Sequence, residues 1–265
     1  MQPTLQDVIE LAQKAGEIIQ SGVSTDLKIR HKGRIDLVTR IDQLSEDFLV
    51  GEIKNRFTGH TIITEETGHH QGHMDHCWYI DPLDGTANYA HGIPIYCVSI
   101  AYMENQQARL AVVLDPTRPE CFSAERGKGA WLNGQLIQVS QITELVDGIL
   151  VTGFPYHTES WHNNLDNFDL FFYEAQSVRR FGSAALDLCY VAAGRADGYW
   201  QIESHAWDMA AGALIVQEAG GVVTDLDGRP DFLKEPYCVV AANPQLHPKI
   251  LDVLNRTGLE KTIKE

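Results

Sequence analysis

The hydrophobic pattern of the first 56 residues predicts two amphipathic helices. Apolar residues recur every three or four positions from the start of the chain, and Gly22 marks the end of this stretch: Leu5, Val8, Ile9, Ala12, Ala15, Gly16 and Ile19. Residues 36–42 predict a short strand that runs into a second helix, whose inner face we expect to carry Leu44, Phe48, Leu49 and Ile53.

Asp42 lies at the start of this second helix, where two interpretations are open. An aspartate there can cap the free N–H groups of the first helical turn. It can equally be a functional carboxylate at the end of a strand. The pattern alone does not separate these two roles.

The middle of the chain predicts a largely antiparallel sheet. Short apolar runs alternate with polar or glycine-containing turns: 61–64, 77–80, 94–103, 110–115, 120–124 and 130–132. The glycines at 127, 129 and 134 have no G-x-G-x-x-G spacing and precede no helix, so they predict hairpin turns. Residues 1–145 are therefore expected to form an α+β half, with two helices on one sheet.

The pattern changes from about Val146 to alternating strands and helices. Strands are predicted at 148–152, 196–201, 222–224 and 238–242, and helices at 161–173, 183–193, 208–219 and 247–254. Residues 146–265 therefore predict an α/β half, giving an α/β chain overall. No low-complexity linker separates the halves, so we expect one compact unit.

Composition narrows the possible functions. The chain has 265 residues and a formal net charge of −15, which argues against nucleic-acid binding; no direct nucleic-acid partner is expected. An anionic substrate remains possible if bound cations reverse the local field. The five cysteines include no C-x-x-C pair, which favours reduced thiols and a cytoplasmic protein. No apolar run reaches the ~18 residues of a membrane helix, so no membrane partner is expected.

The sequence Asp-Pro-Leu-Asp-Gly-Thr at residues 81–86 is the strongest candidate for chemistry. Pro82 and Gly85 predict a sharp turn after an apolar strand. Asp81 and Asp84 could merely belong to that turn, because aspartate is a common turn residue. Two carboxylates on one rigid turn are, however, costly to bury without a cation. Free N–H groups at Gly85 and Thr86 could then bind an anion such as phosphate.

Two further acids stand at the ends of apolar elements. Glu65 follows the strand at 61–64, and Asp208 is in the first turn of the helix at 208–219. Each has an ordinary explanation, as a solvated acid or a helix cap. Taken with Asp81 and Asp84, they favour one shared cation site. The histidine-rich segment 69–76 fits no standard zinc spacing, and we expect a polar, mobile surface flap.

Three spaced motifs resemble the signatures of the inositol monophosphatase family: Glu65-Glu66, Asp81-Pro-Leu-Asp-Gly-Thr86 and Trp207-Asp208-x-Ala-Ala-Gly212. The likeness extends through Asp36-Leu-Val-Thr-x-x-Asp42, Gly182-Ser-Ala184 and Glu218-Ala-Gly-Gly221, which covers nearly the whole chain. The resemblance implies a layered αβαβα sugar-phosphatase fold, Mg²⁺ dependence, lithium inhibition and commonly a homodimer. The implied activity is hydrolysis of a phosphate monoester by a metal-activated water.

The same resemblance assigns roles to individual residues. It implies that two or three Mg²⁺ ions bind Glu65, Asp81, Asp84, Asp208 and the carbonyl of Leu83. It implies that Thr86, hydrogen-bonded to Asp42, orients the attacking water, so the expected catalytic residues are Glu65, Asp42 and Thr86. The phosphate oxygens are expected at the N–H groups of Gly85 and Thr86. Gly182, Ser183, Ala184 and Gln201 are expected around the substrate alcohol.

Gln201 departs from the family pattern, which has glutamate seven residues before the Trp-Asp aspartate. The change removes a charge from the expected inositol contact but leaves a group that donates and accepts hydrogen bonds. The expected substrate is therefore inositol phosphate or a similar polyol phosphate. Fructose 1,6-bisphosphate, histidinol phosphate or phosphoadenosine phosphate are alternatives. A transcription-associated binding protein is the alternative from another class, and Arg179-Arg180 is the one basic feature expected beside the site.

Overall fold

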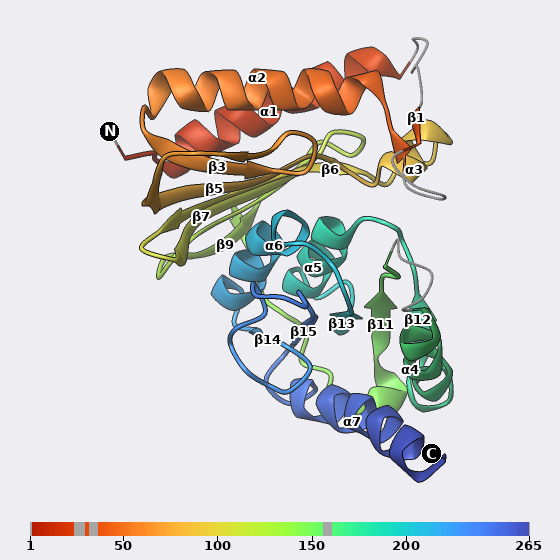
Figure 1. Cartoon of the computed structure of the whole chain (residues 1–265). Helices are drawn as coiled ribbons and strands as arrows, with labels where there is room; N and C mark the ends of the chain where they lie inside the picture. Colours follow the sequence, from red (N-terminus) through yellow and green to blue (C-terminus); the bar gives the residue numbers. More distant parts are fainter. Residues whose placement is uncertain (1, 24–29, 32–36, 156–160, 265) are drawn as a thin grey trace.

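Helices and sheets alternate in five layers in the computed structural model of the chain (Figure 1). One pair of helices covers the outer face of the first sheet, a second pair lies between the two sheets, and a third pair covers the outer face of the second sheet. The expected α/β class and αβαβα layering are confirmed. The structure describes residues 2–23, 30–31, 37–155 and 161–264.

The first sheet has eight strands in the order β10-β9-β8-β7-β6-β5-β3-β4. Every neighbouring pair is antiparallel except β3 and β5, which run parallel. Its strands are β3 (His60–Thr64), β4 (Gly68–His70), β5 (His73–Asp84), β6 (Cys97–Glu104), β7 (Gln107–Asp115), β8 (Glu120–Glu125), β9 (Gly129–Leu132) and β10 (Gln135–Leu136). The outer helices are α1 (Leu5–Gly22) and α2 (Arg40–Arg56). This is the predicted pair of helices on a largely antiparallel sheet.

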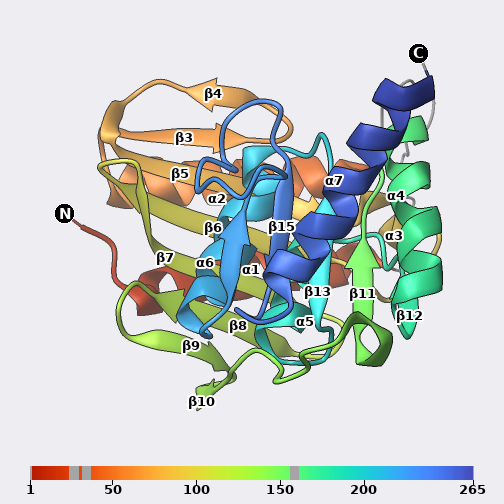
Figure 2. The same ribbon diagram turned by 90° about the horizontal axis from the view of Figure 1, so that it is seen from below.

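The second sheet has five strands in the order β12-β11-β13-β15-β14. β12, β11 and β13 are parallel, whereas β15 is antiparallel to both of its neighbours. Its strands are β11 (Ile149–Thr152), β12 (Ser177–Arg179), β13 (Gly198–Gln201), β14 (Val222–Thr224) and β15 (Val239–Ala242). The helices on its outer face, α4 (Trp161–Glu174) and α7 (His247–Lys264), pack side by side (Figure 2).

The layer between the sheets consists of α5 (Ala184–Ala192) and α6 (Ala206–Glu218). Both helices are almost wholly apolar because both sheets pack on them. A Cβ atom on Gly212 would lie 2.6 Å from Cβ of Leu188, so glycine is needed for the close approach of α6 to α5. One continuous apolar cluster contains side chains from α5, α6 and both sheets. The two halves therefore share a core, while a second cluster lies under α1 and α2.

Short elements complete the described chain. β1 (Arg30–His31) pairs with β2 (Leu37–Val38), α3 (Thr86–Ala90) follows β5, and a 3₁₀ turn occupies Leu145–Asp147. Asp36, the first residue of one family-like motif, lies outside the described residues. No helix in the described ranges has the length and apolar content to cross a membrane.

Three local expectations were wrong. Leu44 is 40% exposed, because the buried face of α2 is formed by Ile41, Asp42, Ser45, Glu46, Leu49, Val50 and Ile53. The histidine-rich segment is not a flap: His69 and His70 belong to β4, and β5 begins at His73. The strand before the aspartate motif also runs on to Asp84 rather than ending at Ile80.

Candidate active site

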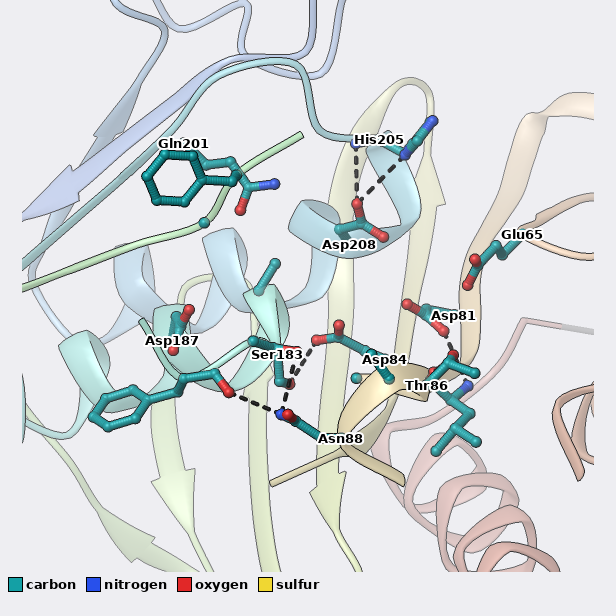
Figure 3. A pocket seen from close by; sticks show the side chains of 18 of the residues that line it. Glu65, Asp81, Asp84, Thr86, Asn88, Ser183, Asp187, Gln201, His205 and Asp208 are labelled. Carbon is teal, nitrogen blue, oxygen red and sulfur yellow. Dashed lines mark hydrogen bonds and ion pairs between the residues drawn. The ribbon is translucent and has the colours of Figure 1, made fainter. Parts of the chain in front are cut away.

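A pocket of about 540 Å³ lies where the end of β5 faces the first turns of α5 and α6. Every predicted site residue except Asp42 lines it: Glu65, Asp81, Leu83, Asp84, Gly85, Thr86, Gly182, Ser183, Ala184, Gln201 and Asp208. The close-up in Figure 3 shows acids from β5, α6 and the turn after β3 around one space. Residues from both halves of the chain therefore meet at one site.

A bulge in β5 directs the two aspartates of the motif into this pocket. Asp81 pairs with Ser99 and Asp84 with Cys97, so three steps along β5 face two steps along β6. Pro82 lies inside the bulge, where its missing N–H costs no ladder hydrogen bond. The N–H of Leu83 donates to Asp81 Oδ1 over 2.9 Å, which fixes the bulge.

Gly85 follows the bulge in a conformation that other residues rarely adopt. Its φ is +92°, and a Cβ atom would lie 2.8 Å from the backbone oxygen of Ile95. Glycine is therefore required both by the backbone angle and by space. This residue turns the chain directly from Asp84 into α3.

Asp84 connects the two halves of the molecule. Its Oδ2 accepts hydrogen bonds from Ser183 Oγ at 2.7 Å and from the N–H of Ala185 at 2.8 Å. Both donors are at the start of α5, whose N-terminal end favours a negative charge. Ser183 therefore holds a metal-site candidate as well as lining the pocket.

Asp208 is the third residue of α6, which begins two residues earlier than predicted. Its Oδ2 accepts from Ser204 Oγ at 2.9 Å. It also accepts from the N–H of His205 at 3.1 Å (Figure 3). The N-cap residue is therefore His205, and Asp208 completes the capping box as the third residue of the helix. It also lines the pocket, so the same side chain takes part in the helix cap and remains a candidate metal ligand.

Glu46 positions the turn that carries Glu65, and no motif in the sequence pointed to Glu46. Glu46 is buried on α2, and its two oxygens accept from the N–H groups of Glu66 at 2.9 Å and Thr67 at 2.7 Å. It therefore fixes the turn that carries Glu65 into the pocket. The available signal was the i, i+4 spacing of Glu46 from Asp42, which places both acids on one face of the helix.

Thr86 contacts the one predicted residue that lies outside the pocket lining. Its hydroxyl lies 2.9 Å from Asp42 Oδ1 and 3.0 Å from the backbone oxygen of Leu83. Asp42 is the third residue of α2, and Thr39 is the N-cap, so the aspartate itself is not the capping residue. Asp42 Oδ2 accepts from the N–H of Thr39 at 2.8 Å and completes the capping box.

Burial and mutual repulsion raise the pKa values of these carboxyl groups. Burial raises the pKa of Asp81 well above its usual range, and the charges of Glu65, Asp84 and Asp208 raise it further. Burial and then the charge of Asp208 raise the pKa of Asp84 to about 7. Burial also raises the pKa of Asp42. A bound cation would reverse the repulsion and favour the ionised forms.

The donor set fits a hard divalent cation. The candidates are four carboxylates and the Leu83 carbonyl, all oxygen donors that Mg²⁺ prefers. Among the described residues, no three His, Cys, Asp or Glu side chains are grouped closely enough to hold one ion. Mg²⁺ keeps several waters and binds proteins through one or two carboxylates, so it does not need a tight cluster of three acidic side chains.

The side of the pocket away from Glu65 and Asp81 carries Gln201 and Asp187 (Figure 3). The Tyr199 hydroxyl donates to Gln201 Oε1, which fixes the amide. Asp187 is on α5 and was not identified from the sequence, because an acid in an otherwise apolar helix carries no motif. Burial raises the pKa of Asp187 well above its usual range, and the charge of Asp84 adds to this.

Comparison with known proteins gives consistent matches. The model of the inositol monophosphatase family matches residues 1–258. The chain is 41% identical over 263 residues to "Nus factor SuhB" of Pseudomonas aeruginosa, covering 96% of each protein. It is 42% identical over 257 residues to "Phosphatase IMPL1, chloroplastic" of Arabidopsis thaliana, covering 94% of this chain and 69% of the relative.

A solved structure agrees with these relatives. The inositol monophosphatase from Anabaena (Nostoc) sp. PCC 7120 superimposes with a TM-score of 0.84 at 39% identity, covering 93% of each chain.

Proposed function

The chain belongs to the inositol monophosphatase family, and we propose on this basis that it is a Mg²⁺-dependent phosphomonoesterase. The proposed reaction transfers the phosphoryl group of a polyol ester to water. The observation that carries the proposal is the convergence of Glu65, Asp81, Asp84 and Asp208 on one pocket. Four acids from three parts of the sequence would repel one another there without a cation.

Glu65, Asp81, Asp84, Asp208 and the Leu83 carbonyl would hold two or three Mg²⁺ ions. Bound Mg²⁺ would supply Lewis acidity, which activates water and stabilises the leaving oxygen of an in-line displacement. The Asp-x-x-Asp-Gly-Thr spacing differs from the Asp-x-Asp-Gly-Thr motif of haloacid-dehalogenase-type phosphatases. Pro82 stands where an aspartate nucleophile would be needed, so the proposal involves no covalent phosphoenzyme.

Thr86 would orient the attacking water and pass on its proton. The Thr86 hydroxyl donates toward Asp42 Oδ1 at 2.9 Å, which leaves its oxygen lone pair free to accept from water. The raised pKa of buried Asp42 suits a group that takes up a proton during the reaction. The N–H groups of Gly85 and Thr86 would hold the phosphate oxygens, because both residues line the pocket beside Asp84.

Further properties are proposed from the family resemblance. We expect inhibition by lithium and assembly into a homodimer. The five cysteines are all free, and four of them are buried, which is consistent with a reducing compartment such as the cytoplasm.

The test is a phosphate-release screen with Mg²⁺ and, separately, with EDTA. The panel contains myo-inositol 1-phosphate, fructose 1,6-bisphosphate, histidinol phosphate and phosphoadenosine phosphate. We expect Mg²⁺-dependent release, fastest from the inositol ester. Hydrolysis that persists in EDTA would contradict the metal mechanism, and a faster rate on another ester would change the proposed substrate.

A second function is supported by the name of a relative. The Pseudomonas aeruginosa protein at 41% identity is called a Nus factor, so binding to a component of the transcription machinery is the second candidate. Arg179 and Arg180 are both exposed: Arg179 ends the edge strand β12, and Arg180 lines the pocket. Purified protein that hydrolyses none of the esters but binds a purified transcription factor with a defined affinity would favour this function.

A further inference from the structure

Asp187 lines the pocket but is not one of the proposed metal ligands. Asp187 is 1% exposed and lies in the first turn of α5. Among the described residues, no donor lies within hydrogen-bond reach of Asp187 Oδ1. A buried carboxyl oxygen without a partner is uncommon and costs stability, so it calls for an explanation.

The surroundings of Asp187 define one end of the pocket, which we name the alcohol end: Asp187, Gln201, Phe154 and Arg180. Figure 3 shows Asp187 and Gln201 on the side away from Glu65 and Asp81, with Asp84 and Ser183 between. The Arg180 guanidinium is exposed and lies 5.2 Å from the centre of the Phe154 ring. The buried part of the alcohol end therefore carries the Asp187 carboxyl and the Gln201 amide, while the Arg180 guanidinium lies at its outer side.

We propose that Asp187 binds a hydroxyl group of the substrate alcohol and so selects esters of neutral polyols. The inference rests on the proposed phosphatase function and names its substrate class. A hydroxyl can give the carboxyl the hydrogen-bond donor that the protein does not supply. A second phosphate on the alcohol cannot donate when ionised, and it would have to be desolvated beside an acid.

Asp187→Leu tests the inference because leucine has a similar volume and no hydrogen-bonding group. We compare kcat/KM for myo-inositol 1-phosphate with kcat/KM for p-nitrophenyl phosphate, whose alcohol has no further hydroxyl. The ratio of the two constants should fall about tenfold in Asp187→Leu, the loss of one hydrogen bond to a buried group. Asp187→Asn should keep the ratio within about threefold of wild type, because an amide still donates and accepts.

A purely structural role for Asp187 would give a different result. Replacing an unpartnered buried polar group with an apolar one is neutral or stabilising, so Asp187→Leu should melt at the wild-type temperature or above it. A lower melting temperature with an unchanged ratio would overturn the proposal. The matched control is Asp197→Asn, a buried acid outside the pocket that accepts from the N–H of Ile149 at 2.7 Å. It should leave the ratio unchanged.

Two further measurements distinguish a hydroxyl from an ammonium group as the partner of Asp187, and separate failure of this inference from failure of the proposed function. If Asp187→Leu weakens hydrolysis of histidinol phosphate more than that of the inositol ester, an ammonium group is the partner and the hydroxyl assignment is overturned. If wild type hydrolyses no ester, the proposed function fails. The affinity of wild type and of Asp187→Leu for myo-inositol 1-phosphate, measured by calorimetry in the presence of Ca²⁺, then tests whether Asp187 contacts the ligand. Affinity about tenfold weaker in Asp187→Leu supports it. Equal affinity, or no binding by either protein, overturns it.

Discussion

Thr86 donates its hydroxyl toward Asp42 Oδ1 over 2.9 Å, although 44 positions separate the two residues. The other oxygen of Asp42 accepts from the N–H of Thr39 at the start of α2. Thr39 rather than Asp42 is the N-cap residue, and the second oxygen of Asp42 completes the capping box. The capping interaction holds the carboxylate in place for its contact with Thr86.

Thr86→Val should lower kcat by roughly 10²–10³-fold, because it removes the group that orients water and passes on its proton. The effect on the melting temperature should be small by comparison, since valine has nearly the same shape. The measurement is steady-state phosphate release with Mg²⁺. Thr61→Val is the matched control: Thr61 is buried on β3, and its hydroxyl has no hydrogen-bond partner among the described residues. Equal activity of both variants would rule out the proposed role of Thr86.

Gln201→Glu should shift preference toward inositol phosphate. A carboxylate accepts two hydroxyl donors where the amide offers one acceptor, and the Tyr199 hydroxyl can still donate to it. The ratio of kcat/KM for myo-inositol 1-phosphate to that for p-nitrophenyl phosphate should rise about tenfold, the effect of one charge-assisted hydrogen bond. An unchanged ratio would mean that Gln201 does not touch the substrate.

The stabilisation by Mg²⁺ should increase with pH. The folded-state pKa of Asp84 is raised to about 7, so in the metal-free protein this group contributes stability that is fully present below the unfolded pKa of 3.8 and is lost as pH rises through about 7. Mg²⁺ must displace that proton, so it binds better above about pH 7. The melting-temperature difference between Mg²⁺ and EDTA should therefore be larger at about pH 8 than at about pH 5.5. The same difference at both pH values would argue against a buried carboxylate site.

His60 should limit stability on the acid side. Its Nδ1 accepts from Trp78 Nε1 at 3.1 Å, and its ring stacks on His76 at 4.7 Å between centroids. Burial, and then the charges of His76 and His73, lower the pKa of His60 from 6.5 to about 4. A lowered histidine pKa contributes stability that is present above 6.5 and is lost as pH falls toward 4.

His60→Gln should therefore lose less stability than wild type between these pH values, as measured by urea unfolding. Exposed His91→Gln serves as the control. Parallel pH profiles for wild type and His60→Gln would show that His60 titrates normally.

The sequence predicted the layers and the site motifs but not the positioning residues. The Asp81–Thr86 motif was identifiable because a proline, a glycine and two acids in six residues restrict the backbone strongly. Glu46 and Asp187 were missed because each lies inside a helix and acquires its role only through packing against distant segments. The histidine-rich segment was predicted wrongly for a similar reason: pairing with β3 overrides its polar composition.

Asp84→Asn tests most directly whether the converging acids form a metal-dependent catalytic site. Asparagine can still accept hydrogen bonds from Ser183 and the N–H of Ala185, so the fold should survive. The measurement is phosphate release from myo-inositol 1-phosphate, after metal removal and again after addition of Mg²⁺. We expect activity in wild type only with Mg²⁺, and kcat at least about 100-fold lower in a folded Asp84→Asn variant. Near-normal turnover in Asp84→Asn, or full wild-type activity without metal, would contradict the account.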